Sequence, residues 1–397
     1  MTTPHHKMPK LHIAMLISNL RGDGAVGMLL SLAEELSNRN YTIDLLTVRE
    51  DGERAECLPA NVRQIKLGAS RPLRAVPAIA RYLRQVRPSV LIASEHYTGL
   101  PALYALFLAR VNTRCVIRQD NTWGMDSRRF RGRHRFLTPW MVDLCFRYAE
   151  IIAVSKGVAR DLIGHFPHLR KNVTVIYNPV LSERLIARAR EPLSHPWFAP
   201  GKPPVLVAAG RLQPAKGFDV LIDAFSRVVK VTPARLLILG EGPDRERLQQ
   251  QIMANNLTDA CELVGYQYNP YPYMARSHAF VLSSRFEGLP TVLIEALAVG
   301  ATVIATDCHS GPREILADGA FGTLVPVEDV NALADAMVAQ ILNPRAIRAD
   351  LGEWLHQFDV DTSVGKHEKL IQATLASPPP RARPIPLSID GGTQDRH

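Results

Sequence analysis

The chain has 397 residues, 46% of them hydrophobic and 21% charged. This composition excludes a mainly disordered or fibrous protein, and the length favours two globular domains over one. The net charge of +9 makes phosphates, nucleic acid or acidic lipid plausible partners. The five cysteines lie far apart and form no CxxC pair, which excludes a disulfide framework and a zinc site and favours a reducing compartment.

The N-terminal segment has no feature of a secretion signal. Residues 1–10 are polar and lead directly into an apolar run, without the apolar core of a signal peptide. The most apolar stretch, 100–109, has about half the length that a membrane-spanning helix needs. We therefore expect a cytoplasmic protein, with peripheral attachment to the inner face of the cell membrane as a further expectation.

Apolar runs of strand length alternate with helical patterns in the first half of the chain. The strand runs are 11–17, 42–48, 90–93, 115–118, 151–154 and 173–176, and the helical patterns include 26–38, 73–85 and 156–163. Such alternation predicts a parallel sheet that is covered by helices on both faces.

A second alternating series follows a polar, proline-bearing stretch. Its strand runs are 205–209, 236–239, 261–264, 279–283, 302–305 and 323–325, and its helical patterns are 220–229, 244–255 and 291–299. We therefore expect an α/β protein with two Rossmann-like, doubly wound domains at 1–180 and 204–361, joined by a linker at 181–203. A helix at 362–376 is expected to return to the first domain, and the Pro-, Arg- and Gly-rich tail at 377–397 is expected to be disordered.

Ligands of open parallel sheets bind beyond the carboxyl ends of the strands. Two such domains facing each other would form a deep cleft, which is the default position for an active site.

A glycine turn at 22–27 lies between the first predicted strand and helix. Gly22, Gly24 and Gly27 fit the GxGxxG string of dinucleotide sites, although the acid that should end the second strand, Glu50 or Asp51, stands farther on than usual. A turn of this kind before a helix binds any phosphate, and it also occurs as a tight turn without a ligand. An NAD-dependent oxidoreductase is therefore the alternative function.

A second cluster follows the predicted strand at 205–209. Arg211 and Lys216 stand five residues apart on this loop, between Gly210 and Gly217. At the carboxyl end of a strand the two cations are well placed to hold a diphosphate, arginine with a planar fork and lysine with a point charge. Taken alone, the pair is also compatible with solvated loop cations.

A third cluster contains two acids, Glu287 and Glu295, separated by seven residues. Pro290 suits the first turn of a helix, so Glu287 is expected in a loop and Glu295 on the helix. Gly288 allows a ligand to approach the backbone. The two carboxylates can accept hydrogen bonds from different hydroxyls of one sugar nucleotide, or they can simply face solvent. No metal site is expected, because no His or Asp stands at supporting spacing.

These clusters, with the strings 239–243, 264–266 and 306–314, occur in the order found in one known family. In them the second half of the chain resembles the family-4 retaining glycosyltransferases, which have the GT-B fold. The first half resembles that family more loosely, at 19–36, 154–156 and 175–179. The NAD interpretation leaves the clusters of the second half without a role.

The resemblance implies that 204–361 binds a nucleotide-sugar donor and that 1–180 faces the acceptor. Arg211 and Lys216 would hold the diphosphate, Glu287 the sugar and Glu295 the ribose hydroxyls, with Glu287, Lys216 and Arg211 as the catalytic candidates. The further donor-binding candidates are Gly24, Gly210, Gly265, Tyr266, Gly288, Leu289, Pro290 and Thr291.

The resemblance also implies the type of reaction. Family members transfer a sugar with retention of its anomeric configuration and use the nucleotide sugar as co-substrate, with no metal and no other cofactor. The string at 310–314 favours a UDP-sugar that carries a hexose or an N-acetylhexosamine. The implied acceptor is a glycan or a lipid-linked glycan, in the biosynthesis of surface polysaccharide, lipopolysaccharide or another glycoconjugate.

Two departures from the family pattern concern the acceptor side. Val26 and Gly27 stand where many members have Glu-Arg, and the strand at 115–118 leads to Gln119 and Asp120 where a histidine is frequent. His96 and Asp120 are the acceptor-side candidates, and the sequence does not decide between them. For His96, a structural role in the core is the alternative.

A basic run occupies 128–135. Its arginines are Arg128, Arg129, Arg131, Arg133 and Arg135, interleaved with Phe130. It indicates a surface for anionic membrane lipid, with a solvated loop as the alternative. Nucleic acid is not expected as a partner, because the sequence contains no recognised nucleic-acid-binding module.

Overall fold

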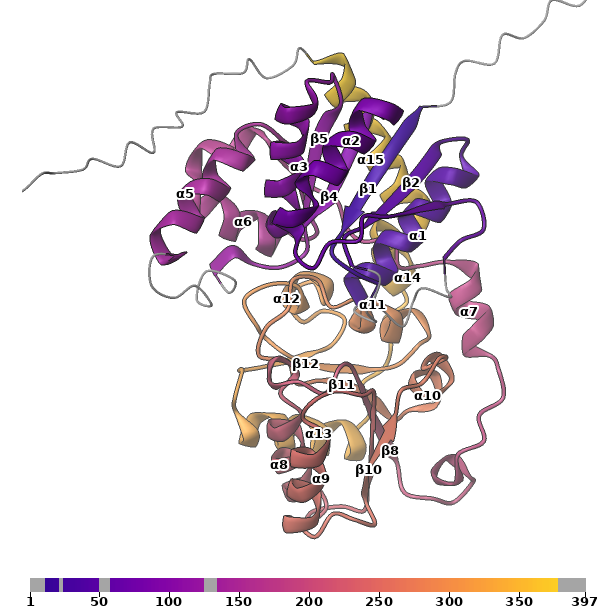
Figure 1. Ribbon diagram of the computed structural model, residues 1–397. Coiled ribbons are helices and arrows are strands. Elements are labelled where there is room, and N and C mark those ends of the chain that lie inside the picture. The colour runs from indigo at the N-terminus through magenta and orange to yellow at the C-terminus, as the bar shows by residue number, and fades with distance from the viewer. Residues whose placement is uncertain (1–10, 21–23, 50–57, 125–133, 378–397) are drawn as a thin grey trace, which may run out of the picture.

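The structure is a computed structural model, which describes residues 11–20, 24–49, 58–124 and 134–377. Two parallel β-sheets lie one above the other, each with helices packed around it (Figure 1). Within the described ranges, no helix is both long and apolar enough to cross a membrane.

The first sheet has seven strands in the order β3-β2-β1-β4-β5-β6-β7. The strands are β1 (His12–Ile17), β2 (Thr42–Thr47), β3 (Arg63–Lys66), β4 (Val90–Ser94), β5 (Arg114–Gln119), β6 (Glu150–Ala153) and β7 (Val173–Val175). The helices of this half are α1 (Gly24–Asn38), η2 (Pro72–Ala75), α2 (Val76–Val86), α3 (His96–Ala109), α5 (His134–Phe146), α6 (Lys156–His165) and η3 (Pro167–Lys171).

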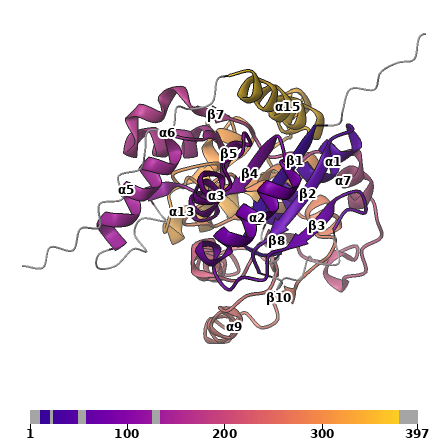
Figure 2. The same ribbon diagram turned by 45° about the horizontal axis from the view of Figure 1, so that its top comes forward.

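Alternate residues of β1 explain why helices cover both faces of this sheet. Ala14 and Leu16 are buried in the same cluster as Ile79 of α2, whereas Met15 is buried with Leu29 of α1. Successive side chains of a strand point to opposite faces, so an uninterrupted apolar run needs cover on both. Figure 2 shows α2 and α3 on one side of the sheet and α1 and α15 on the other.

The second sheet has six strands in the order β10-β9-β8-β11-β12-β13. The strands are β8 (Val205–Ala209), β9 (Arg235–Leu239), β10 (Cys261–Gly265), β11 (Ala279–Leu282), β12 (Val303–Thr306) and β13 (Thr323–Val325). The helices are η5 (Pro214–Lys216), α8 (Phe218–Val228), α9 (Arg245–Ala254), α10 (Tyr271–Arg276), α11 (Thr291–Ala298), α12 (Pro312–Ile315), α13 (Val330–Leu342), α14 (Leu351–Leu355) and η6 (His356–Phe358).

The stretch between the two sheets is partly helical and is attached to the second domain. It contains α7 (Glu183–Ala189) and η4 (Pro196–Phe198). The guanidinium of Arg188 lies 4.7 Å from the centre of the Tyr268 ring and donates to the Tyr268 carbonyl at 2.6 Å. Arg276 of α10 donates to the carbonyl of Glu191 at 3.0 Å. These contacts fix the connection along the loop that follows β10.

The last helix, α15 (Val360–Ala376), lies along the first domain (Figures 1 and 2). Arg39, just after α1, donates to Glu368 at 2.9 Å and pairs with Asp361. Ser363 donates to the carbonyl of Tyr177 at 2.6 Å. The chain therefore crosses back from the second domain and is anchored at the end of the first sheet.

The first sheet contains a buried charged group on β2. Asp44 has no solvent exposure, accepts from Arg63 Nε at 2.8 Å and from the Tyr82 hydroxyl at 2.6 Å, and lies 3.0 Å from His12 Nε2. Burial raises the pKa of Asp44, but hydrogen bonds from Arg63 and Tyr82, with the charge of His12, outweigh it and hold this pKa below its ordinary value. The ionised carboxylate therefore stabilises the packing of α2 on the sheet.

We expect Asp44→Asn to lower the free energy of unfolding at pH 7 by about 1–3 kcal/mol, because an amide N–H₂ would replace an acceptor and leave a buried donor unpaired. A depressed pKa stabilises the folded state fully above the unfolded-state value of about 3.9, and this stabilisation is lost as pH falls through the lower folded-state value. Urea denaturation across pH should thus show the two proteins converging in acid. A constant difference, or one equal to that of the exposed-site control Asp259→Asn, would contradict the assignment.

Candidate active site

The loops that follow the strands of the two sheets meet where the domains face each other. One close approach is that of Gly288, after β11, to Asp120, after β5: a Cβ atom on Gly288 would lie 1.7 Å from the Asp120 carbonyl oxygen. No side chain fits there, so glycine is required at this position. Where the sequence predicts a cleft, the backbones of the two domains are in direct contact at this point.

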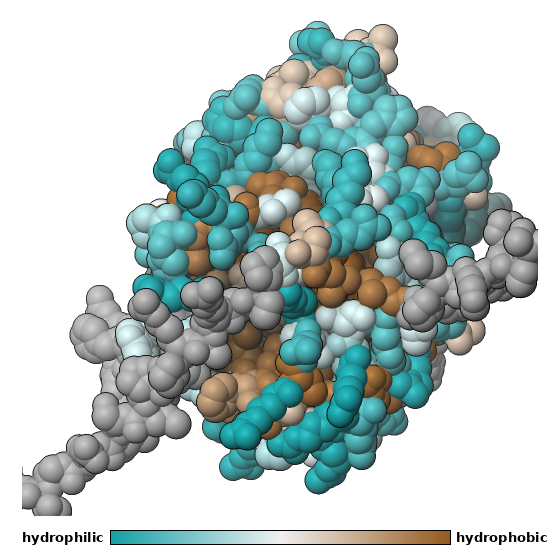
Figure 3. Space-filling model, turned by 90° about the horizontal axis from the view of Figure 1, so that it is seen from above, coloured by the Kyte–Doolittle hydropathy of each residue, from teal (hydrophilic) through white to brown (hydrophobic). Residues whose placement is uncertain are grey.

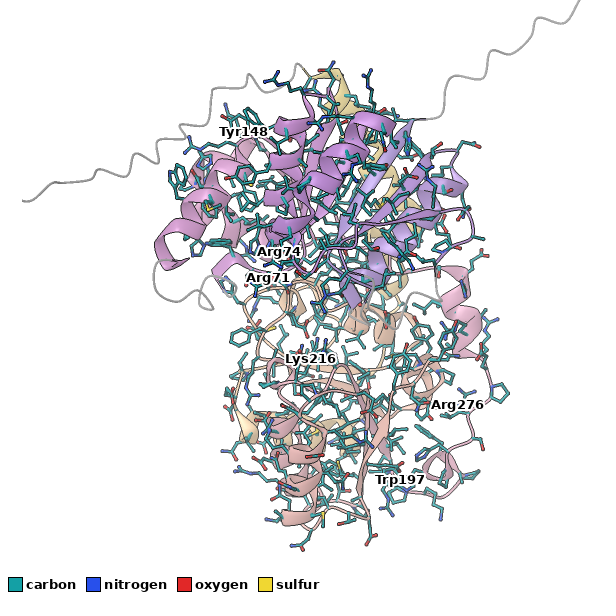
Figure 4. The ribbon with its side chains drawn as sticks, in the orientation of Figure 1. Arg71, Arg74, Tyr148, Trp197, Lys216 and Arg276 are labelled. Atoms are coloured by element: carbon teal, nitrogen blue, oxygen red, sulfur yellow. The ribbon has the colours of Figure 1, made fainter. Side chains whose placement is uncertain are left out.

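Beside this contact, the second domain brings two predicted catalytic residues together. Lys216 Nζ donates to Glu287 Oε1 at 2.6 Å, and Ser284 Oγ donates to the same oxygen at 2.6 Å. The two charged side chains are only 20% and 10% exposed, so solvent screens their attraction less than at an open surface. Figure 4 shows Lys216 at the end of the second domain that faces the first.

The loops after β8 and β11 are tied to each other beneath this ion pair. Ser283 Oγ donates to the Lys216 carbonyl at 2.9 Å, and the Arg285 backbone N–H donates to the Ala215 carbonyl at 2.8 Å. The Arg285 guanidinium pairs with Asp219, at the start of α8, at 2.8 Å. Lys216 and Glu287 are therefore positioned by backbone contacts, and their approach does not depend on side-chain attraction alone.

The N-termini of α1 and α11 also meet at the junction. A Cβ atom on Gly24, the first residue of α1, would lie 3.8 Å from Thr291 Oγ1, at the start of α11. Pro290 is the residue just before α11, one position ahead of the predicted first turn. Free backbone N–H groups give a helix N-terminus a partial positive charge. Two such termini from different domains therefore converge next to Glu287.

The other donor-side candidates take different positions. A Cβ atom on Gly210 would lie 3.5 Å from the Lys216 side chain, whereas Arg211 is exposed on the same loop. Glu295 lies on α11 and is half-buried. Of the remaining candidates, Gly265 ends β10, Tyr266 is 60% exposed beyond it, and Leu289 is buried before α11. The structure thus joins Lys216, Glu287 and Gly210 directly, and places the rest around them.

His96, an acceptor-side candidate, is packed inside the first domain. It is 6% exposed, and its ring lies edge-on to Trp123 with the ring centres 5.0 Å apart. Burial lowers the pKa of His96 to about 4, although contact with Gln119 opposes the shift. The ring is neutral at pH 7 and is a weak base there, so its position fits the structural alternative.

Asp120, the second acceptor-side candidate, directs its carboxylate toward a buried arginine. Asp120 Oδ2 accepts from Arg118 Nη1 at 2.7 Å, and Oδ1 lies 2.6 Å from Arg118 Nη2. Arg118 also donates to Asn178 Oδ1 at 2.6 Å. Burial raises the pKa of Asp120, and the charge of Arg118 and a hydrogen bond from Ser94 oppose the rise. It is the backbone carbonyl of Asp120 that contacts the second domain.

Glu95 has a role at the junction that sequence reasoning missed. Glu95 Oε1 accepts from the Asn121 side chain at 2.9 Å and from the Asp120 backbone N–H at 3.2 Å. Its φ of +68° is rare for a residue with a side chain and costs about 1–3 kcal/mol. Glu95 therefore fixes the loop of Asp120 and Asn121, whose backbone contacts Gly288. An isolated acid before a helix gives no sequence signal of such strain.

Some of the residues that the sequence singled out are not described by the structure. Gly22, Glu50 and Asp51 lie outside the described residues, as do positions 128–133 of the basic run. Among the residues that the structure describes, no group of three or more His, Cys, Asp and Glu side chains is arranged to hold a metal ion.

Two family models match the chain, one for each domain. Residues 22–184 match the model described as Glycosyltransferase Family 4, and residues 190–354 match the model described as Glycosyl transferases group 1. Together the two matches span both sheets from α1 onward. They decide between the two interpretations of the glycine turn in favour of the glycosyltransferase.

Similar proteins support the same assignment. An N-acetylgalactosaminyltransferase of Campylobacter jejuni that acts on N-acetylgalactosamine-N,N'-diacetylbacillosaminyl-diphospho-undecaprenol is 31% identical over 62% of this chain and 66% of its own length. The amylovoran biosynthesis glycosyltransferase AmsD of Erwinia amylovora is 28% identical over 88% of this chain and 95% of its own.

Among solved structures, Anabaena HepE in complex with UDP and glucose superposes with a TM-score of 0.74. It is 19% identical, and the superposition covers 91% of this chain and all of HepE. The predicted two-domain architecture is confirmed by this likeness. The chain belongs to the family-4 glycosyltransferases, and its fold is GT-B.

Proposed function

We propose that this glycosyltransferase moves a hexose or N-acetylhexosamine from a UDP-sugar to a glycan or lipid-linked acceptor, with retention of configuration. One observation carries the proposal: Lys216 and Ser284 hold Glu287 beside the converging N-termini of α1 and α11. A cation, an oriented acid and two helix ends together match a sugar joined to a diphosphate.

The positive groups at the junction suit the leaving group. Negative charge grows on the nucleoside diphosphate as the bond to the sugar breaks, and preorganised donors stabilise that charge. An ammonium has three N–H donors, and contact with Glu287 uses one of those on Lys216. Arg211, on the same loop, adds a second cation. We therefore propose that the enzyme uses no metal and no cofactor other than its nucleotide-sugar co-substrate.

The two acids have different roles in this proposal. Glu287 accepts hydrogen bonds from Lys216 and Ser284 on Oε1, which leaves Oε2 to accept from hydroxyls of the donor sugar. Glu295, farther along α11, accepts from the ribose hydroxyls, and the backbone at Gly265 contacts the base. Because Glu287 is fixed before the donor binds, it orients the anomeric carbon toward the first domain.

The names of the relatives support the acceptor class. The Campylobacter relative acts on a glycan carried by a lipid diphosphate, and the Erwinia relative functions in amylovoran biosynthesis. UDP in the HepE complex supports UDP as the nucleotide. We propose a role in surface-polysaccharide or related glycoconjugate biosynthesis.

A lipid-linked acceptor requires access to a membrane, and the first domain has a suitable surface. Apart from the buried Arg118, positions 58–119 contain nine Lys and Arg residues and a single acid, the buried Glu95. Arg84 of α2 donates to the Leu108 carbonyl at 2.7 Å, next to Phe107, which is 54% exposed. Figure 3, which looks down on the molecule from above, shows apolar patches within a hydrophilic surface. We propose that this surface and the basic run at 128–135 attach to anionic lipid on the inner face of the cell membrane.

The donor class is tested by thermal shift with UDP-, GDP- and ADP-sugars and with NAD. We expect UDP-sugars to raise Tm, because a ligand held only by the folded state stabilises it by about 2.7 kcal/mol at a hundred times its Kd. Stabilisation by NAD and by no sugar nucleotide would overturn the proposal, and stabilisation by GDP-sugars alone would correct the base.

Lys216→Ala is expected to reduce donor turnover by about a hundredfold or more, the usual loss when one preorganised donor is removed. Lys230→Ala, an exposed lysine of the same domain, is the control. Lys216→Ala also leaves the Glu287 carboxylate without its cation. In Lys216→Ala/Glu287→Gln this carboxylate is neutral too, so activity lost in both variants reports on the missing contact between Lys216 and the diphosphate. Undiminished turnover in Lys216→Ala, with unchanged Tm, would remove this residue from the mechanism.

Membrane attachment is tested by co-sedimentation with vesicles that contain or lack anionic lipid. Replacing the five arginines of 128–135 by alanine is expected to weaken binding to anionic vesicles at least tenfold, because each basic residue near the surface contributes about 1 kcal/mol. Arg227→Ala/Lys230→Ala, in the second domain, is the matched control. Equal binding by the wild type and the arginine variant would contradict a role for this run.

A further inference from the structure

A group of hydrogen bonds between the domains is concentrated at the N-terminus of α6. Ser155 precedes this helix and accepts from the backbone N–H of Val158 at 3.0 Å, as a helix cap does. The same hydroxyl donates across the junction to the Gly288 carbonyl at 2.9 Å. The start of α6 is therefore both the end of a first-domain element and a contact surface for the second domain.

Glu314 of α12, in the second domain, binds the N-terminus of α6. Its Oε1 accepts from the Lys156 backbone N–H at 2.8 Å, and its Oε2 accepts from the Gly157 backbone N–H at 3.3 Å. The Tyr177 hydroxyl, at the end of the first sheet, donates to Oε1 at 2.6 Å. A carboxylate at a helix N-terminus is favoured because it pairs unsatisfied N–H groups and the positive end of the helix dipole.

The backbone of α6 rests directly on the loop that precedes Glu314. A Cβ atom on Gly157 would lie 2.3 Å from Ser310 Oγ and 2.8 Å from Ser310 Cα. Residue 157 must therefore be glycine for α6 to approach this loop. In contrast, Gly164 at the other end of α6 has no atom within 4 Å of the equivalent position.

A shared hydrogen-bond network connects this contact to the donor loop. Ser155 Oγ and Ser310 Oγ lie 2.8 Å apart, and each also lies within 2.9 Å of the Gly288 carbonyl oxygen. Two hydroxyl hydrogens serve these three contacts, so at least one always reaches the Gly288 carbonyl. Gly288 immediately follows Glu287, whose carboxylate Lys216 and Ser284 hold.

We infer that Glu314 is a positioning residue for the transfer reaction. Its carboxylate accepts hydrogen bonds from the N-terminus of α6 and from Tyr177, and these bonds fix the position of the first domain relative to the second. Because Ser155 donates to the Gly288 carbonyl, this relative position of the domains also fixes the loop that carries Glu287. This inference rests on the proposed role of Glu287 at the donor sugar, although the domain contact itself is independent of any substrate.

The test combines hydrogen–deuterium exchange with donor kinetics on full-length Glu314→Gln. An amide keeps the size of the side chain but replaces one of its two acceptors by a donor, so one backbone N–H at the start of α6 loses its partner. We expect faster exchange in 155–158 and, in parallel, in 284–290. We also expect kcat for UDP-sugar to fall at least tenfold, with the Kd for UDP changed less than twofold, because the second domain holds the nucleotide.

Two matched controls separate this effect from general destabilisation. Asp318→Asn changes an acid of the second domain that is 82% exposed and pairs with Arg313, and it should match the wild type in both measurements. Gly157→Ala should reproduce the effect of Glu314→Gln by a clash, whereas Gly164→Ala on the same helix should not.

Faster exchange confined to 155–158 would overturn the inference, since Glu314 would then be only a helix cap. An unchanged kcat despite faster exchange in both segments would also overturn it. If the wild type turns over no UDP-sugar, the proposed function fails by itself, and the exchange result still decides whether Glu314 couples the two domains.

Discussion

The Lys216–Glu287 ion pair is the interaction around which the junction of the two domains is arranged. In the second domain, contacts between the loops after β8 and β11 fix the positions of Lys216 and Glu287. The first domain restricts the loop of Glu287, because the Asp120 carbonyl leaves no room for a side chain at Gly288. A displacement of either domain therefore moves the loop of Glu287 through rigid backbone, which suits the proposed role of this acid in orienting the hydroxyls of a bound sugar.

Polar groups of the first domain support this arrangement without facing the donor. Arg118 and Asp120 neutralise each other in the interior, and Glu95 accepts from the loop that carries Asp120. Breaking such a buried pair is costly, because it leaves an uncompensated charge. The unfavourable backbone conformation of Glu95 persists since the surrounding contacts fix it. These two acids have their hydrogen-bond partners within the first domain, whereas Glu287 is held by Lys216 and Ser284 of the second.

Much of the fold could be predicted from the sequence, because a strand buried on both faces is a continuous apolar run, as in β8. The edge strand β3 was missed, since its sequence RQIK contains one apolar residue. Lys216 and Glu287 were found as separate motifs, but their contact was not predicted. Glu314 and Lys156 are 158 positions apart, so no local pattern contains their hydrogen bond. Contacts between domains follow from the packing of both, and that packing is absent from any single segment.

The helix ends at the junction differ in what they have available for a ligand. The N-terminus of α6 is occupied by Glu314, so the protein itself supplies the anion there. The described part of α1, from Gly24 onward, and the helix α11 have no acid in their first turns, and the residue before α11 is a proline that provides no side-chain cap. Since a helix N-terminus favours an anion, we propose that the diphosphate binds beside the contact of Gly24 with Thr291, on the side of the loop that carries Lys216. On this view the N-terminus of α6 joins the two domains, and the N-terminus of α11 is available to the proposed donor.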